Sequence, residues 1–241
     1  MSTTISAKQF IAKLKTHSSP AEGEKLKRYF KNTGGDQFIG VRMGQVFTLA
    51  KEFIDMTPDE IEKLLDSKIH EVRAGGCSIM DKQARRKKTP EERRKELYDL
   101  YLRRHDRINN WDLVDVCAIH VIGGYLYDND KPRNVLYKLA RSKNMWERRT
   151  AIVSTAYFIR QRDLDDTFKI AEMLLQDKED LVHKATGWML RFTGDKDRAR
   201  LLSFLDKHAA TMPRTALRYS IEKLDKKQRE HYLSLKNRKE Q

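Results

Sequence analysis

Residues 145–152 read Met-Trp-Glu-Arg-Arg-Thr-Ala-Ile, and looser versions of this string recur along the chain, at 69–74, 110–115, 181–185 and 212–217. Each string contains, or is followed at once by, a small or branched apolar residue: Ala74, Val116, Ala151, Ala185 and Ala216. Subtracting their numbers gives spacings of 42, 35, 34 and 31 residues. These spacings are close to the period of helical-pair repeats, in which small residues let neighbouring helices approach closely.

The pattern between these strings is also helical. Only 5 prolines and 11 glycines interrupt the 241 residues, and apolar residues recur at i, i+3, i+4 and i+7. Two helix starts carry a threonine followed by proline and acidic residues, at 57–60 and 89–92. We predict an all-α helical-repeat solenoid, an α-α superhelix with a concave basic groove. It would form one domain over 1–241, with a charged tail from about 226 to 241. A compact helical bundle is the alternative.

The composition favours a polyanionic partner. The formal net charge is +14, from 49 Lys and Arg against 35 Asp and Glu, and only 39% of residues are hydrophobic. Such a surplus attracts nucleic acid through phosphate neutralisation and counterion release. The dense basic run at 85–88 is interpreted either as a solvated loop between repeats or as a phosphate contact or flexible arm.

Several classes of protein find no support in the sequence. No stretch approaches the ~18 apolar residues of a membrane span, and residues 1–9 have no apolar core of signal-peptide length. The two cysteines, Cys77 and Cys117, are expected to be buried free thiols. Motifs for nucleotide, metal or hydrolase sites are absent. We therefore expect an intracellular, cytoplasmic protein that works without cofactor, metal or membrane.

The most informative candidate site lies at 108–115. Asn109 or Asn110 can cap a helix that begins beside them. Trp111 and Asp115 are four residues apart and so share one face of that helix. An indole face and a carboxylate together suit a developing cation. The structural alternative is that Trp111 fills the core while Asp115 caps a helix or pairs with an arginine.

Two further strings combine cations with aromatic rings. Arg148 and Arg149 follow Trp146 at the start of a helix, where they suit phosphate contacts, a contact with Asp115 or a surface ion pair. Lys184, Trp188 and Arg191 share a second helix face. Gly187 lies beside Trp188, and its lack of a side chain permits close approach by another backbone. Burial of all three tryptophans as core anchors is the alternative.

With these strings in view, the chain resembles the AlkD-like DNA alkylation repair glycosylases. The resemblance rests on blocks in family order between about Tyr29 and Arg218, at 29–32, 38–42, 49–51, 109–115, 146–152 and 184–191. The chain departs from the family at Met43-Gly44-Gln45-Val46-Phe47 and has a short loop at 32–36. These departures bear on the contacts that the N-terminal region makes with a lesion.

The resemblance implies HEAT-like repeats that cradle duplex DNA containing alkylated bases. It implies a monofunctional DNA-3-methyladenine/7-methylguanine-type glycosylase. Trp111, Asp115 and Trp188 would form the catalytic cluster, with Arg149 as the adjacent basic group. We expect a monomer in which further cations contact DNA: Arg42, Arg73, Arg148, Lys184, Arg191, Arg214 and Arg218.

A purine alkylated at N3 or N7 is cationic, so it leaves as a neutral base without a strong general acid. The barrier is the positive charge on the deoxyribose, which Asp115 and the two indoles can stabilise. Asp115 can also orient or deprotonate the attacking water. Two alternatives remain: a non-catalytic repeat protein that recognises distorted or branched DNA, and a scaffold for a protein partner.

Overall fold

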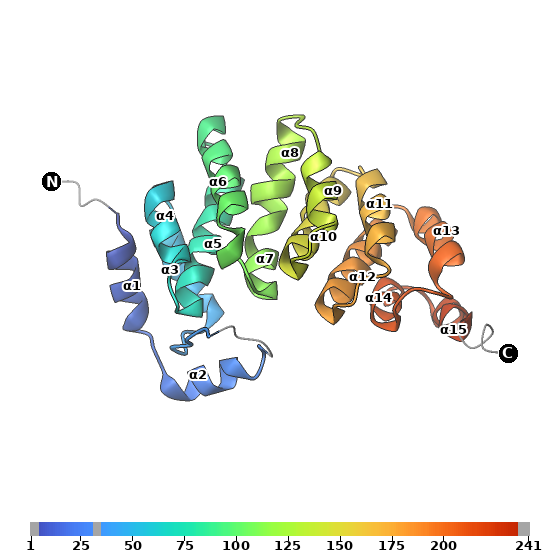
Figure 1. Ribbon diagram of the computed structural model, residues 1–241, viewed down its shortest axis with the longest axis horizontal. Helices are drawn as coiled ribbons and strands as arrows, with labels where there is room; N and C mark the ends of the chain where they lie inside the picture. Colours follow the sequence, from blue (N-terminus) through green and yellow to red (C-terminus); the bar gives the residue numbers. More distant parts are fainter. Residues whose placement is uncertain (1–4, 31–34, 236–241) are drawn as a thin grey trace. The chain divides into compact units, whose positions relative to one another are not determined.

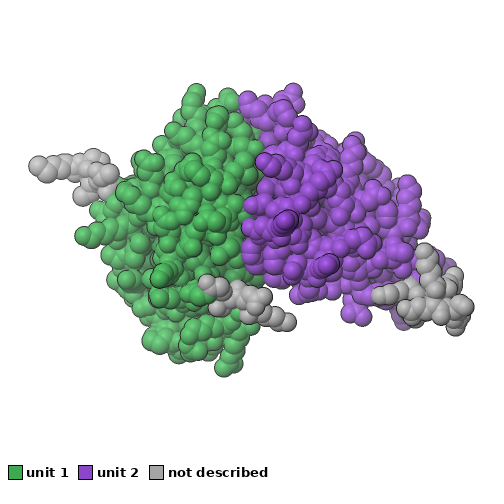
Figure 2. All heavy atoms as spheres, viewed as in Figure 1, with its two compact units in different colours: residues 1–125 green, residues 126–241 purple. Residues whose placement is uncertain are grey.

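The structure is a computed structural model that describes residues 5–30 and 35–235. Within these ranges the regular structure is helical, apart from one isolated parallel bridge between Gln37 and Ile69. The chain divides into two compact units, unit 1 at Met1–Tyr125 and unit 2 at Leu126–Gln241 (Figure 2). That residues 1–241 act as one repeat domain with a basic groove along it stays a prediction.

Unit 1 is built from two rows of helices around a central helix, α5 (Figure 1). One row packs α3, α5 and α7 side by side, and the other packs α1, α4 and α6. The chain runs through α1 (Ala7–Lys15), α2 (Pro20–Lys27), α3 (Met43–Glu52), α4 (Pro58–Leu65), α5 (His70–Arg85), α6 (Glu91–Arg103), the 3-10 helix η1 (His105–Arg107), α7 (Trp111–Ala118) and the π-helix η2 (Ile119–Gly124).

Unit 2 repeats this arrangement. The helices α10, α12 and α14 pack in one row, while α9, α11 and α13 cover them from the other side. The elements are α9 (Asn134–Ala140), α10 (Met145–Arg160), α11 (Asp165–Leu174), α12 (Asp180–Gly194), α13 (Arg198–His208), α14 (Arg214–Ser220) and α15 (Lys226–Ser234), and the short α8 (Tyr125–Asp128) begins at the boundary between the units.

The repeated small residues mark one row of helices in each unit, as the spacing predicts. Ala74 lies on α5 and Val116 on α7, while Ala151, Ala185 and Ala216 lie on α10, α12 and α14. The four alanines are at most 1% exposed. The all-α repeat architecture is confirmed, because each pair of helices buries its apolar faces against the next pair within its unit.

Local signals set most helix starts. The predicted start at 57–60 is confirmed, since Pro58 is the first residue of α4 and Asp59 and Glu60 lie in its first turn. The second predicted start, at 89–92, is wrong by one residue. Pro90 rather than Thr89 is the residue that precedes α6. Thr89 Oγ1 instead accepts a hydrogen bond from Arg86 Nε at 3.2 Å.

The structure also describes the two cysteines, the charged tail and the basic run. Cys77 and Cys117 are free and buried, as predicted. Residues 226–234 of the predicted charged tail form α15, and residues 236–241 lie outside the described part. The connection at 86–90 is a loop, in which Arg86 pairs with Asp55 at 2.6 Å. Among the described helices, none has the length and apolar character that crossing a bilayer requires.

Candidate active site

The candidate site of unit 1 lies at the start of α7. Asn110 caps the helix with its side-chain oxygen, which accepts the Trp111 N–H at 2.8 Å, so the cap prediction is confirmed for Asn110. Trp111 and Asp115 follow on the same face, one turn apart, and both are half-buried. The acid therefore lies at the unit's surface layer beside the indole rather than in the packed interior.

Trp111 belongs to a cluster of aromatic rings. Its ring lies nearly parallel to that of Phe30, with centroids 5.8 Å apart. Phe30 stacks in turn on Phe38 at 5.0 Å, and both rings contact His70, at 4.6 and 5.0 Å. The cluster packs Phe30 and Phe38 against His70 at the start of α5, and Phe30 also against Trp111 in the first turn of α7.

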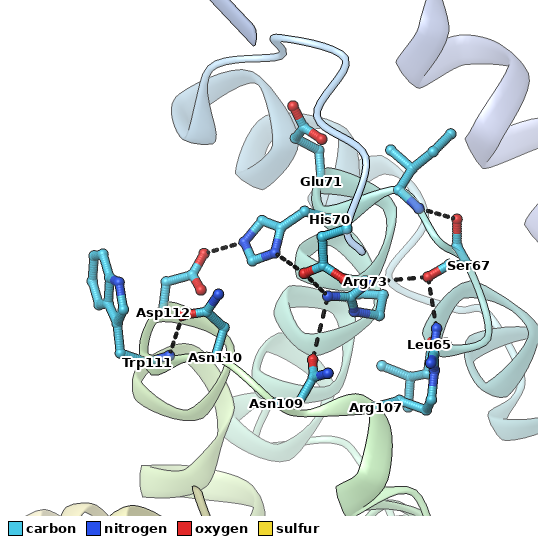
Figure 3. A network of polar contacts seen from close by, with 12 residues as sticks. Leu65, Ser67, His70, Glu71, Arg73, Arg107, Asn109, Asn110, Trp111 and Asp112 are labelled. Carbon is cyan, nitrogen blue, oxygen red and sulfur yellow. Dashed lines mark hydrogen bonds and ion pairs between the residues drawn. The ribbon is translucent and has the colours of Figure 1, made fainter. Parts of the chain in front are cut away.

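A buried polar network lies behind these rings (Figure 3). His70 Nε2 is 2.7 Å from Asp112 Oδ2, and His70 Nδ1 is 3.4 Å from Asp36 Oδ2. Arg73 also binds Asp36, and it donates to Ser67 O at 3.1 Å and Asn109 Oδ1 at 3.3 Å. Burial favours the neutral carboxyl, but hydrogen bonds from His70 and Arg73 outweigh it and lower the pKa of Asp36.

Glu71 fixes the segment that leads into α3. Its carboxylate is fully buried and accepts the backbone N–H groups of Ile39, Gly40 and Val41 at 3.0, 2.8 and 3.3 Å. Gly40 has a φ of +79°, and a Cβ there would lie 1.9 Å from Ser19 O. The turn therefore requires glycine, and Glu71 satisfies donors that would otherwise be orphaned.

The other predicted catalytic residues, Arg149 and Trp188, lie in unit 2. Arg149, near the start of α10, is 4% exposed and donates to the Leu181 carbonyl oxygen at the start of α12. Trp188 is half-buried on α12 and meets Phe192 edge to face at 5.4 Å. Trp111 and Asp115 thus belong to unit 1, while Arg149 and Trp188 belong to unit 2. That these four act together stays a prediction.

Gly187 lets α14 approach α12 closely beside Trp188, as the sequence predicts. A Cβ at Gly187 would lie 2.4 Å from the Ala216 carbonyl oxygen and 2.5 Å from Tyr219 Cβ. Such distances are not tolerated without movement of the backbone. The packing of α14 against α12, which presents Trp188, therefore depends on the missing side chain.

We expect Gly187→Ala to destabilise unit 2 by about 1–3 kcal/mol through overpacking. Alanine favours a helix by about 1 kcal/mol over glycine, but the clash with backbone outweighs this gain. Gly44→Ala is a matched control, because nothing lies within 4 Å of a Cβ at that position on α3. Thermal melting checks both variants. A Gly187→Ala protein that melts at or above the parent temperature would contradict the packing.

Comparison with known proteins adds the family. Residues 10–224 match the family described as DNA alkylation repair enzyme. The chain belongs to this family. A solved structure titled "Predicted DNA alkylation repair enzyme from Enterococcus faecalis" superposes with a TM-score of 0.68 at 17% identity, covering 87% of this chain and 98% of that chain. At this identity the likeness shows the shared helical-repeat fold. No curated protein matches the chain.

Two arginines predicted to touch DNA are engaged inside this repair-family fold. Arg73 is 1% exposed and bound as described above. Arg148 pairs with Asp177 through Nε at 2.5 Å and Nη2 at 3.0 Å, and also donates to Ser142 O and Lys143 O. Hydrogen bonding to Asp177 raises the pKa of Arg148. Their placement does not support the predicted phosphate contacts, and we assign both a structural role.

The other predicted cations are more accessible. Arg42 and Arg218 are exposed, and Lys184, Arg191 and Arg214 are half-buried. Most have a nearby partner: Glu22 for Arg42, Asp180 for Lys184, Glu222 for Arg191 and the Leu233 carbonyl for Arg214. Surface ion pairs of this kind contribute about 0–1 kcal/mol, so a phosphate can replace the carboxylate.

Sequence reasoning missed several residues at this site. It assigned no role to His70, Asp36 or Asp112. His70 is 34 residues from Asp36 and 42 residues from Asp112 in the sequence. It also passed over Tyr219, which is 37% exposed beside Gly187. The available signal was that His70 lies in the repeat string at 69–74, Asp112 in the block at 109–115 and Asp36 between the blocks at 29–32 and 38–42. Within the described residues, no cluster of three or more potential metal ligands occurs.

Proposed function

We propose that this member of the DNA alkylation repair family is a DNA glycosylase that hydrolyses the N-glycosidic bond of cationic N3- or N7-alkylated purines in duplex DNA. The observation that carries the proposal is that Trp111 and Asp115 share one helix face and are both partly accessible. They lie one turn apart on α7, half-buried, in a chain of this family. A buried or distant acid would offer nothing to a sugar cation.

The proposed reaction needs few catalytic groups from the protein. The C1′–N9 bond breaks and its electron pair neutralises the alkylated purine, which leaves without added protons. Positive charge then collects on the deoxyribose, where the Asp115 carboxylate and the Trp111 ring face stabilise it. Water adds to C1′ and loses one proton, which Asp115 accepts or passes to solvent. Ordinary glycosidases need a second carboxyl group as acid, which the cationic leaving group makes unnecessary.

The proposal includes residues of unit 2 as well. Trp188 presents a second half-buried indole, and Arg149 is held near the start of α12 by the Leu181 carbonyl. We assign Trp188 to the sugar cation and Arg149 to a phosphate or to Asp115. Arg42, Lys184, Arg191, Arg214 and Arg218 bind backbone phosphates. Action as an intracellular monomer without a cofactor is part of the proposal.

The proposal is tested with duplex DNA that carries one 7-methylguanine. We expect free 7-methylguanine and an equal amount of abasic sites, measured by chromatography and by alkaline strand cleavage. Tight DNA binding with intact glycosidic bonds would reject the glycosylase in favour of a non-catalytic DNA-binding protein. Absence of DNA binding would reject both and favour a protein scaffold.

The affinity for DNA should fall steeply with salt, since several phosphates are contacted. Arg218→Ala should lower the slope of log affinity against log salt by about 0.9, the value for one phosphate. Lys207→Ala is the control, because Lys207 is exposed on α13, in the other row of helices. Binding titrations between low and moderate salt check this. A flat dependence, or equal effects of both variants, would count against the proposed interface.

A further inference from the structure

His70 is fully buried at the start of α5, and both of its ring nitrogens face carboxylates. Nε2 is 2.7 Å from Asp112 Oδ2, and Nδ1 is 3.4 Å from Asp36 Oδ2. A neutral imidazole carries one N–H donor and one acceptor, and an ionised carboxylate only accepts. Both contacts can therefore be hydrogen bonds only when the ring is an imidazolium.

The charges of the network give the same result. Asp36 and Asp112 contribute two negative charges, and the Arg73 guanidinium bound to Asp36 contributes one positive charge. An imidazolium at His70 makes the cluster neutral, whereas a neutral ring leaves a buried net negative charge, which is costly. Among the described residues, Asp112 Oδ1 is buried without a hydrogen-bond partner, so His70 at Oδ2 is the cationic partner of this carboxylate.

The charged groups that face His70 come from each element packed on it. Asp36 comes from the segment before α3, Asp112 from α7 and Arg73 from α5, and the rings of Phe30 and Phe38 lie against the imidazole. Burial favours the neutral ring and Arg73 repels the cation, but the hydrogen bonds to Asp112 and Asp36 prevail and raise the pKa of His70 above its usual 6.5.

This histidine is linked to the indole of the proposed site by two routes. Asp112 directly follows Trp111 in the first turn of α7, as Figure 3 shows. His70 also contacts Phe30, whose ring lies parallel to that of Trp111. Loss of the His70 proton would remove one of its two hydrogen bonds to a carboxylate. The cluster would then hold one net negative charge, because Asp36 and Asp112 outnumber Arg73. The first turn of α7 and the Phe30 ring would then lose their common support.

We propose that His70, as an imidazolium held between Asp36 and Asp112, is a positioning residue that fixes Trp111 for substrate. The proton on His70 thereby controls the placement of an aromatic ring that it does not touch. The role of His70 in the reaction rests on the proposed glycosylase function. Its role in placing Trp111 rests on the contacts alone. The stabilisation is fully present below pH 6.5 and is lost as pH rises through the raised pKa of the folded protein.

Two measurements without DNA test the placement. In the unaltered chain, imidazole nitrogen resonances should show both His70 nitrogens protonated on the acid side of a titration whose midpoint lies above 6.5. In a Trp146→Phe/Trp188→Phe variant, Trp111 is the one remaining tryptophan, and its emission should change with the same midpoint. His70→Gln should abolish that change, whereas His17→Gln, an exposed histidine of unit 1, should leave it intact. A His70 midpoint at or below 6.5, or Trp111 emission that does not follow the titration, would overturn the proposal.

A third measurement separates this inference from the proposed function. In the chain with its three tryptophans, base release should fall by about tenfold or more as pH rises through the His70 midpoint, since small misplacements in a site are costly. His70→Gln should be slow at every pH while binding DNA normally. A release rate in His70→Gln that matches the parent would overturn the role in the reaction. Absence of release by the parent would instead reject the glycosylase, with the placement of Trp111 still decided by the two measurements above.

Discussion

Replacing Asp115 with asparagine is expected to slow release of 7-methylguanine by about 100- to 1,000-fold, the usual cost of losing one electrostatic contact to a transition state. Asparagine has nearly the same shape but no charge, so it can still contact water and DNA. It cannot stabilise the cation that forms on the sugar. DNA affinity should change little, because the carboxylate is not a phosphate ligand. Single-turnover release and binding titrations measure the two effects separately.

The matched control for this variant is Asp106→Asn. Asp106 is an exposed acid of the 3-10 helix η1 in unit 1, and its Oδ1 lies 3.3 Å from Arg104 Nε. The Asp106→Asn variant should release 7-methylguanine at the parent rate. If Asp115→Asn also retains the parent rate, Asp115 has no catalytic role, and the assignment of a lone carboxylate to the sugar cation is wrong.

Glu71→Ala is expected to destabilise unit 1 by about 3–5 kcal/mol, as breaking a buried charged contact does. The fully buried carboxylate accepts three consecutive backbone N–H groups, from Ile39 to Val41. Alanine leaves these donors without partners in a site that water does not reach. The segment that carries Asp36 and Phe38 should then loosen, and with it the support of Trp111.

Hydrogen exchange of the Ile39, Gly40 and Val41 amides, together with urea unfolding, measures this effect. Glu52→Ala serves as control, because Glu52 makes an exposed ion pair with Lys13, and such pairs contribute little. We expect faster exchange and an earlier unfolding transition in Glu71→Ala alone. Unchanged protection of the three amides would mean that Glu71 does not hold the segment.

The sequence predicts the fold well because each repeat is marked by residues close together in the sequence. Each of the five small residues falls on a helix of the same row within its unit, since close helix packing selects for them. The cap at Asn110 is also a local device and was predictable. The start of α6 was misplaced by one residue, because Thr89 binds Arg86 rather than the helix N-terminus.

The site was less predictable because its contacts are long-range. Spacing places Trp111 and Asp115 on one helix face, but it cannot reveal that Arg148 finds Asp177 29 residues away, or that Arg73 finds Asp36 37 residues away. Both arginines therefore looked like phosphate ligands. The His70 network escaped prediction for the same reason, since its two acids come from different segments of the chain.

In the proposed mechanism, one carboxylate suffices because the leaving base already carries positive charge. The most direct test compares release of cationic 7-methylguanine with release of neutral hypoxanthine from otherwise identical duplexes, under single-turnover conditions with the unaltered chain. We predict release of 7-methylguanine well above its spontaneous rate and no detectable release of hypoxanthine. Equal acceleration of both bases, or no acceleration of 7-methylguanine, would contradict the claim.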